Sequence, residues 1–258
     1  MKKAIIYLIE FIALQVVGGA LVNGIWQLVS GTADTTYAML ITSTCVVNVL
    51  IIAIFLLARW TKVSPAWLRT RPWMVLLWSV VASLGALIPS AWFQELMPDL
   101  PNLMENEFDM ILSNRWGYLA IGLLAPLAEE MVFRGAILKS LLHSQRLSVW
   151  GAIVLSAFFF ALIHFNPVQM PHAFLIGLLL GWMYWRTGSI LPGVAYHWAN
   201  NSAAYILYAI YPNPDIKLID IFQGSQQHVY MSLAFSLLIL LPAIYQLHVW
   251  MRRADERR

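Results

Sequence analysis

Eight long apolar stretches, separated by short polar loops, constrain this sequence more than any other feature. A helix needs about 20 mostly apolar residues to cross the hydrocarbon of a bilayer, where only helices and closed barrels satisfy the backbone. The stretches are continuously apolar rather than alternating, which excludes the strands of a membrane barrel. We therefore expect an all-α, polytopic membrane helix bundle of about eight transmembrane helices. The predicted spans are 4–29, 37–58, 73–96, 116–141, 148–165, 170–186, 190–210 and 229–251.

The composition also indicates a membrane protein. Hydrophobic residues make up 60% of the 258 residues and charged residues only 11%, whereas about a quarter of the residues in soluble domains are charged. The net charge of +3 arises from short basic clusters between apolar runs, so we expect the lipid bilayer, and no nucleic acid, as a partner. The single Cys45 lies inside an apolar run, which excludes an internal disulfide and a cysteine-rich metal site.

Lysine and arginine are distributed unevenly between alternate loops, and this predicts the orientation of the chain. Cytoplasmic loops collect basic residues under the positive-inside rule. One side carries only Arg115 and Lys217, and Arg134 lies within a span. We expect both termini in the cytoplasm and, because the chain is compact with short loops, a bacterial cytoplasmic membrane. The basic residues of the other side are Lys2, Lys3, Arg59, Lys62, Arg69, Arg71, Lys139, Arg146, Arg186, Arg252, Arg253, Arg257 and Arg258.

The chain shows no internal repeat, low-complexity tract or soluble domain. We therefore expect residues 1–258 to form a single integral membrane domain. The outer loop 98–114 has apolar residues at helical spacing, which favours an interfacial helix over a substrate gate.

Three charged side chains lie within the predicted span 116–141, where each costs on the order of 3 kcal/mol. Glu130 and Arg134 are four residues apart with the acid first, which is the favourable order for an ion pair. We interpret this pair as support for the helix rather than as direct chemistry. Glu129 lies about 100° further around the helix. It is left as an unpaired carboxylate. Neighbouring hydrogen-bond donors then decide whether it ionises, which is the property that a general base requires.

Further polar side chains lie in the fifth and seventh predicted spans. Phe160 and His164 are four residues apart, as are His197 and Asn201, so each pair shares a helix face. A single buried histidine is more often a satisfied core residue. A carboxylate, two imidazoles and an amide on three spans exceed what helix packing requires. The remaining histidines lie near predicted interfaces without such spacing: His143, His172, His228 and His248.

The familiar intramembrane proteases leave patterns that this sequence lacks. It contains no HExxH for a zinc enzyme and no Gly-x-Ser for a rhomboid-type serine enzyme. Every aspartate falls in a predicted loop or tail, which argues against an aspartyl enzyme. A glutamate-centred site remains.

The motifs EExxxR (Glu129, Glu130, Arg134), FxxxH (Phe160, His164) and HxxxN (His197, Asn201) occur in this order on separate spans. This ordered set resembles the motifs of the CAAX-protease and bacteriocin-processing (CPBP, or ABI) family, which includes the Ras-converting CAAX endopeptidase. The resemblance covers about Gly117 to Ser202 and implies a glutamate intramembrane protease without a cofactor, with a catalytic core at about 116–210.

The residues and the resemblance together predict a mechanism. Glu129, helped by His164, would deprotonate a water that attacks a peptide carbonyl of a substrate in or at the membrane. His197 and Asn201 would donate hydrogen bonds to the oxyanion. Glu130 would hold Arg134, and Phe160 would pack beside the imidazole.

One geometric difficulty and two alternatives accompany this hypothesis. At 1.5 Å per residue, straight helices would place His197 roughly 10 Å and His164 about 24 Å from the cytoplasmic ends, so we expect a tilted fifth span and a cavity open to the cytoplasm. Glu129, His164 and His197 could instead bind zinc in a metal-dependent protease. The cluster could also serve a non-proteolytic scaffold or bacteriocin-immunity protein. The sequence predicts neither the substrate, nor its prenylation, nor the oligomeric state.

Overall fold

The computed structural model describes residues 1–61, 72–144, 146–213 and 216–251, and within these ranges the chain contains helices and no strands. The all-helical prediction is therefore confirmed for the described chain. The predicted orientation rests partly on basic residues that lie outside these ranges, namely Lys62, Arg69, Arg71, Arg252, Arg253, Arg257 and Arg258.

The long helices follow the predicted apolar stretches to within a few residues. They are α1 (Lys2–Ser30), α2 (Tyr37–Leu57), α4 (Pro72–Glu95), α8 (Val149–Leu162), α9 (Met170–Thr187), α10 (Leu191–Ile210) and α12 (Gln226–Trp250). Among the described helices, α1, α2, α4 and α12 are long and apolar enough to cross a membrane, and α8 is a shorter apolar helix.

The predicted span 116–141 is one continuous helical segment with changes in its winding. It consists of η1 (Tyr118–Leu124), α6 (Ala125–Val132), η2 (Phe133–Leu138) and α7 (Lys139–Leu142), where the two η segments are π-helical. Short helices occupy the connections, at α5 (Glu105–Leu112) and α11 (Leu218–Ile221). Helix α5 falls within the loop where the sequence predicts a helix, and it packs against α2 and α10.

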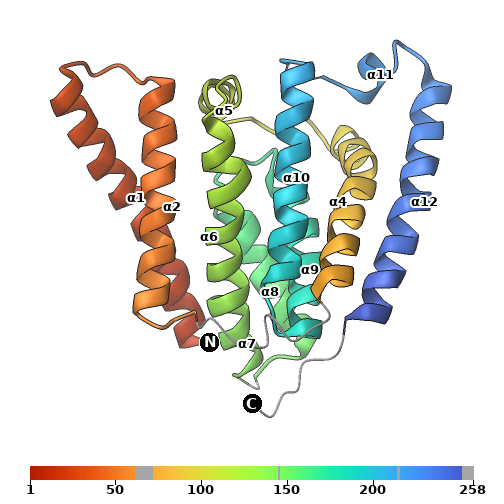
Figure 1. Ribbon diagram of the computed structural model, residues 1–258, viewed down its shortest axis with the longest axis horizontal. Coiled ribbons are helices and arrows are strands. Elements are labelled where there is room, and N and C mark those ends of the chain that lie inside the picture. Colours follow the sequence, from red (N-terminus) through yellow and green to blue (C-terminus); the bar gives the residue numbers. More distant parts are fainter. Residues whose placement is uncertain (62–71, 145, 214–215, 252–258) are drawn as a thin grey trace.

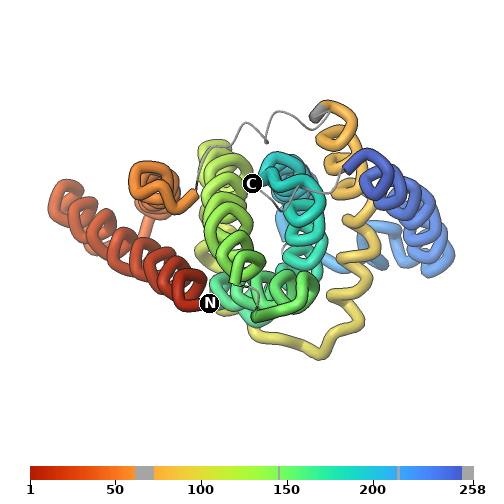
Figure 2. The backbone as a smooth tube through the Cα atoms, turned by 90° about the horizontal axis from the view of Figure 1, so that it is seen from below, coloured from red at the N-terminus to blue at the C-terminus, as the bar shows by residue number. Residues whose placement is uncertain are grey.

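The helices form a bundle with two flanks around a centre (Figure 1). Helices α1 and α2 lie on one flank and α4 and α12 on the other, while α6 and α10 occupy the centre with α8 and α9 behind them. The view from below keeps this order (Figure 2). The closest helix pairs are α4 with α12 and α8 with α9. The motif-bearing helices are therefore those in the centre of the bundle.

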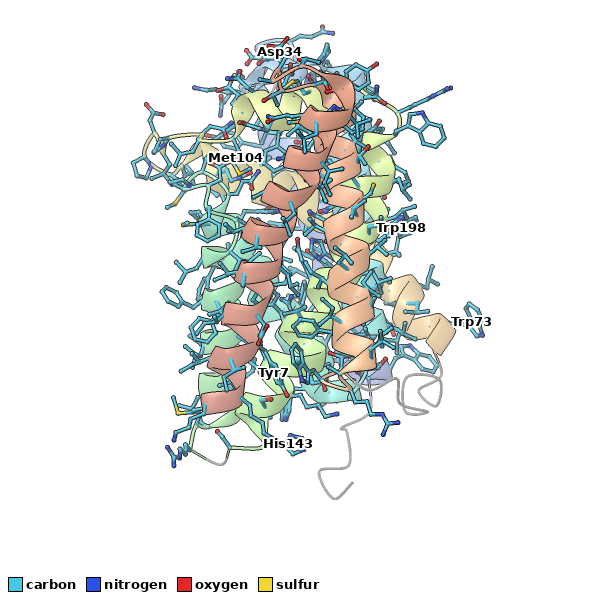
Figure 3. The ribbon with its side chains drawn as sticks, turned by 90° about the vertical axis from the view of Figure 1, so that its left-hand side faces the viewer. Tyr7, Asp34, Trp73, Met104, His143 and Trp198 are labelled. Carbon is cyan, nitrogen blue, oxygen red and sulfur yellow. The ribbon has the colours of Figure 1, made fainter. Side chains whose placement is uncertain are left out.

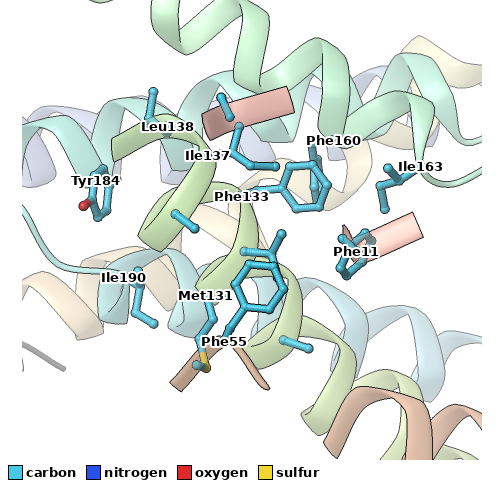
Figure 4. Close-up of a cluster of buried hydrophobic side chains, with 14 of the residues drawn as sticks. Phe11, Phe55, Met131, Phe133, Ile137, Leu138, Phe160, Ile163, Tyr184 and Ile190 are labelled. Carbon is cyan, nitrogen blue, oxygen red and sulfur yellow. The ribbon is translucent and has the colours of Figure 1, made fainter. Parts of the chain in front are cut away.

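Aromatic rings connect the α1 flank to the centre. Phe11 on α1 meets Phe133 on η2 edge-on, with ring centroids 5.4 Å apart, and Phe133 meets Phe160 on α8 at 5.3 Å. Figure 4 shows these rings in one buried cluster together with Phe55 of α2. This packing fixes the position of Phe160, which the sequence places beside a candidate histidine.

Glycines allow α8 and α9 to approach closely. A Cβ atom on Gly177 would lie 2.9 Å from the Cβ of Ala157, and one on Gly181 would lie 2.9 Å from Ile153 Cγ2. Small residues four apart are a common means of close helix packing in membranes. The close approach also presents the Gly177 carbonyl to the centre of the bundle.

Candidate active site

Two π-helical segments flank the turn that carries the paired glutamates. At the first, the Ala125 N–H bonds to the Ala120 carbonyl five residues earlier. The next residue, Pro126, has no N–H, so the Ile121 carbonyl lacks a backbone donor. The Asn201 side chain fills this gap, donating from Nδ2 to the Ile121 oxygen at 2.9 Å. One of the two Nδ2 protons of Asn201 is thereby used in holding α10 against η1.

Side chains also complete the hydrogen bonding around the second π segment. Thr61 Oγ1 donates to the Met131 carbonyl at 2.7 Å, and Ser156 Oγ donates to the Phe133 carbonyl at 3.2 Å. Gly135 makes room for Thr61, because a Cβ there would lie 2.6 Å from Thr61 Cγ2. Irregular winding of this kind is frequent at functional sites.

Glu130 and Arg134 form the predicted ion pair in a fully buried setting. Arg134 Nη1 donates to Glu130 Oε1 at 2.6 Å, and the exposed fractions of the two side chains are 1% and 0%. Arg134 Nη2 also donates to the Gly177 carbonyl at 3.2 Å. The guanidinium carbon lies 4.4 Å from the centre of the Phe160 ring, which adds a cation–π contact.

Glu129 occupies a more open position beside His197. Its side chain is 14% exposed, and its Oε2 lies 3.8 Å from His197 Nε2. The other ring nitrogen of His197, Nδ1, lies 3.6 Å from Glu130 Oε1. Both separations exceed hydrogen-bonding distance. His197 therefore lies between the two carboxylates, with Nε2 towards Glu129.

His164 also packs against the Phe160 ring. Its Nδ1 is 2.8 Å from the Phe160 carbonyl oxygen. Because a carbonyl only accepts, Nδ1 carries the proton in this bond, and a neutral imidazole then has its lone pair on Nε2. The Phe160 ring centroid lies 5.0 Å from that of His164 and 5.7 Å from that of His197. The two imidazoles thus gather around one aromatic ring.

The structure corrects the predicted end of the fifth span at 165. Helix α8 ends at Leu162, so His164 lies in the turn that follows rather than in the helix. Asn166 precedes a proline, which disfavours helical backbone, and Phe165 has a φ of 49°. Both imidazoles contact the Phe160 ring, so the difference in depth that straight helices would impose does not keep them apart. Within the described chain, no hydrogen bond or ion pair joins Glu129 to His164.

The zinc alternative gains no geometric support. Among the residues that the structure describes, no three or more His, Cys, Asp or Glu side chains are placed to hold a metal ion. Glu129, His164 and His197 are therefore not gathered as a set of zinc ligands.

The spacing of the histidines predicts no role for His172, which the structure places within electrostatic range of this site. His172 Nδ1 is hydrogen-bonded to Ser90 Oγ of α4. The imidazole lies close enough to His164 and His197 for their charges to interact. The sequence gives no signal for this contact, because 82 residues separate its partners.

Comparison with known proteins gives one match. Residues 111–203 match the family described as Type II CAAX prenyl endopeptidase Rce1-like, in agreement with the family predicted from the motifs. The matched region runs from the end of α5 into α10 and includes all the predicted site residues. No curated protein and no solved structure matches the chain.

Proposed function

We propose that this chain, whose residues 111–203 carry the Rce1-like prenyl endopeptidase match, is a glutamate intramembrane endopeptidase of the CPBP (ABI) type. Its substrate would be a membrane-associated peptide or protein. The observation that carries the proposal is the placement of Glu129, which is partly exposed and faces His197 Nε2 at 3.8 Å, whereas Arg134 is paired with Glu130. A carboxylate in this setting can bind and deprotonate water.

The proposed reaction begins with a water held by Glu129 and His164. Glu129, assisted by the free Nε2 lone pair of His164, accepts a proton from the water as its oxygen attacks the peptide carbonyl carbon. The same proton then passes to the leaving amine as the carbon–nitrogen bond breaks. Because no Zn²⁺ polarises the carbonyl in this scheme, hydrogen-bond donors must stabilise the oxyanion.

His197 and Asn201 are the proposed donors. His197 would donate from Nε2, the ring nitrogen that lies towards Glu129. Asn201 would use its second Nδ2 proton, since the first is bound to the Ile121 carbonyl. The bond to Ile121 fixes the amide before substrate arrives, and preorganised donors of this kind are each worth about 10²–10³ in kcat.

Glu130, Arg134 and Phe160 have supporting roles in this proposal. The Glu130–Arg134 pair holds α6 to α9 through the Gly177 carbonyl. Phe160 contacts both imidazoles and covers the guanidinium.

We further propose that the chain crosses a bacterial cytoplasmic membrane eight times as one domain, with both termini in the cytoplasm and a catalytic core at about 116–210. In Figure 3, Tyr7, Trp73 and His143 lie towards one end of the bundle and Asp34 at the opposite end. This supports a first helix that crosses the full thickness. His197 lies within two turns of the start of α10, which favours a cavity open to the cytoplasm.

The test is to incubate the purified protein with membrane extracts and identify new peptide termini by mass spectrometry. We expect new termini with the wild type and none with Glu129→Gln, both with and without a strong chelator. Matched prenylated and unprenylated peptides as added substrates would define the substrate class.

Each contrary outcome has a separate meaning. Cleavage by Glu129→Gln would remove Glu129 from the mechanism, and cleavage abolished by the chelator would favour the metal-dependent protease. Absence of cleavage by the wild type, together with a biological phenotype that survives substitution of Glu129 and His164, would favour the scaffold or bacteriocin-immunity protein.

A further inference from the structure

The turn that carries His164 requires support from outside its own helix pair. His164 follows the end of α8, and the next residue, Phe165, adopts a φ of 49°, which L side chains rarely adopt. Such backbone persists only where the surrounding structure holds it. The position of the His164 imidazole therefore depends on what holds this turn.

Asn166 makes the first supporting contact of this turn. It is fully buried, its Nδ2 donates to Asn102 Oδ1 at 2.8 Å, and its Oδ1 accepts from the Leu103 N–H at 3.0 Å. Both partners belong to the connection between α4 and α5. An asparagine two residues after His164 is thus fixed by a segment more than 60 residues earlier in the chain.

The second supporting contact lies where the turn enters α9. The hydrogen bond between Ser90 Oγ on α4 and His172 Nδ1 ties the first turn of α9 to the same region of the chain. His172 lies within interacting distance of His164 and of His197. Ser90 and Asn102 therefore hold the segment 164–172 at two points.

We propose that Ser90, Asn102, Asn166 and His172, here called the turn clamp, are positioning residues that fix the His164 imidazole relative to Glu129. This inference rests on the proposed function and extends it to a part of the chain outside the family match, because Ser90 and Asn102 precede residue 111. The turn clamp acts through His164 and does not itself touch the reacting atoms.

Cleavage kinetics of Ser90→Ala and His172→Phe test the turn clamp. We expect kcat to fall by about 10- to 100-fold with KM nearly unchanged, because misplacing a catalytic group affects the chemical step more than substrate binding. Ser90→Thr keeps a hydroxyl and should restore most of the kcat. The double variant Ser90→Ala/His172→Phe should be no slower than His172→Phe, because both changes remove the same hydrogen bond.

Ser79→Ala is the matched control. Ser79 is buried on α4, the helix that also carries Ser90. Its hydroxyl donates to the Val75 carbonyl of α4 itself, so loss of this hydrogen bond should leave kcat unchanged. Asn102→Ala tests the first supporting contact, between Asn102 and Asn166, and does not alter the packing within the bundle helices. We expect it also to lower kcat.

The inference is overturned if the folded fractions of Ser90→Ala, His172→Phe and Asn102→Ala all turn over as fast as Ser79→Ala. Lower yield or stability with unchanged kcat overturns it equally, since that is a structural role alone. Glu129→Gln belongs in the same series. Turnover by Glu129→Gln defeats the proposed function, whereas an inactive Glu129→Gln beside fully active clamp variants defeats the turn clamp alone.

Discussion

The surroundings of the two adjacent glutamates differ in how fully they are closed. Around Glu130, the sealed polar region consists of Glu130, Arg134, and the backbone of Gly177 and Gly193, and both of its charged side chains are almost completely buried. Around Glu129, the open polar region consists of Glu129, His164, His197 and Asn201, of which only His197 is buried. Neighbouring carboxylates on one helix therefore meet very different environments.

This difference suggests that one region contributes to the stability of the fold and the other to the reaction. In the sealed polar region Glu130 Oε1 is bound to Arg134 at 2.6 Å, and the glutamate side chain has no exposed surface at which it could meet a water. In the open polar region Glu129 Oε2 lies 3.8 Å from His197 Nε2, beyond hydrogen-bonding distance. We expect substitutions in the sealed region to change mainly the free energy of unfolding, and substitutions in the open region to change mainly the rate of cleavage.

The largest stability effect is expected for Arg134→Met, which leaves Glu130 buried without its cation. Removing one partner of a buried ion pair costs about 3–5 kcal/mol. Denaturant unfolding of the purified protein in detergent micelles measures this loss. The double variant Arg134→Met/Glu130→Leu removes both charges and should recover most of it. Unfolding of Arg134→Met at the wild-type midpoint would show that the ion pair contributes nothing to stability.

A smaller effect is expected for Gly193→Ala on α10. The added methyl group would press on the Glu130 carboxylate, and overpacking of this kind costs about 1–3 kcal/mol. Gly24→Ala on α1 is the control, because nothing lies within 4 Å of a Cβ placed there. The comparison predicts that only Gly193→Ala lowers the unfolding midpoint. Equal midpoints for the two variants would mean that the sealed polar region tolerates added volume.

The smallest effect is expected for Thr61→Val, which removes the hydroxyl donor of the Met131 carbonyl next to η2. Loss of this buried hydrogen bond should cost about 1 kcal/mol. Thr44→Val is the matched control, since the Thr44 hydroxyl donates to Leu40 within the regular helix α2. We expect the Thr44→Val midpoint to stay near that of the wild type. An equally stable Thr61→Val protein would indicate that the Met131 carbonyl beside η2 needs no side-chain partner.

The features that the sequence predicts well are local. Apolar runs indicate the helices because their length and composition are set by the bilayer, and the i, i+4 spacing of Glu130 and Arg134 places their charges on one helix face. The FxxxH spacing likewise brings Phe160 against His164, although His164 lies beyond the helix end.

The features that the sequence does not predict depend on contacts between distant segments. Pro126 is visible in the sequence, but the donor for the Ile121 carbonyl comes from Asn201 on another helix. The approach of His197 to both glutamates, and of His172 to Ser90, depends on how α4, α9 and α10 pack against the centre. Spacing along one helix carries no information about these partners.

Glu129→Gln and Glu130→Gln, compared for both cleavage rate and unfolding, test the central claim most directly. We predict that Glu129→Gln unfolds with the wild-type midpoint yet cleaves no substrate, while Glu130→Gln loses stability because Arg134 is left without a counter-charge. Substrate turnover by folded Glu129→Gln protein would contradict the account.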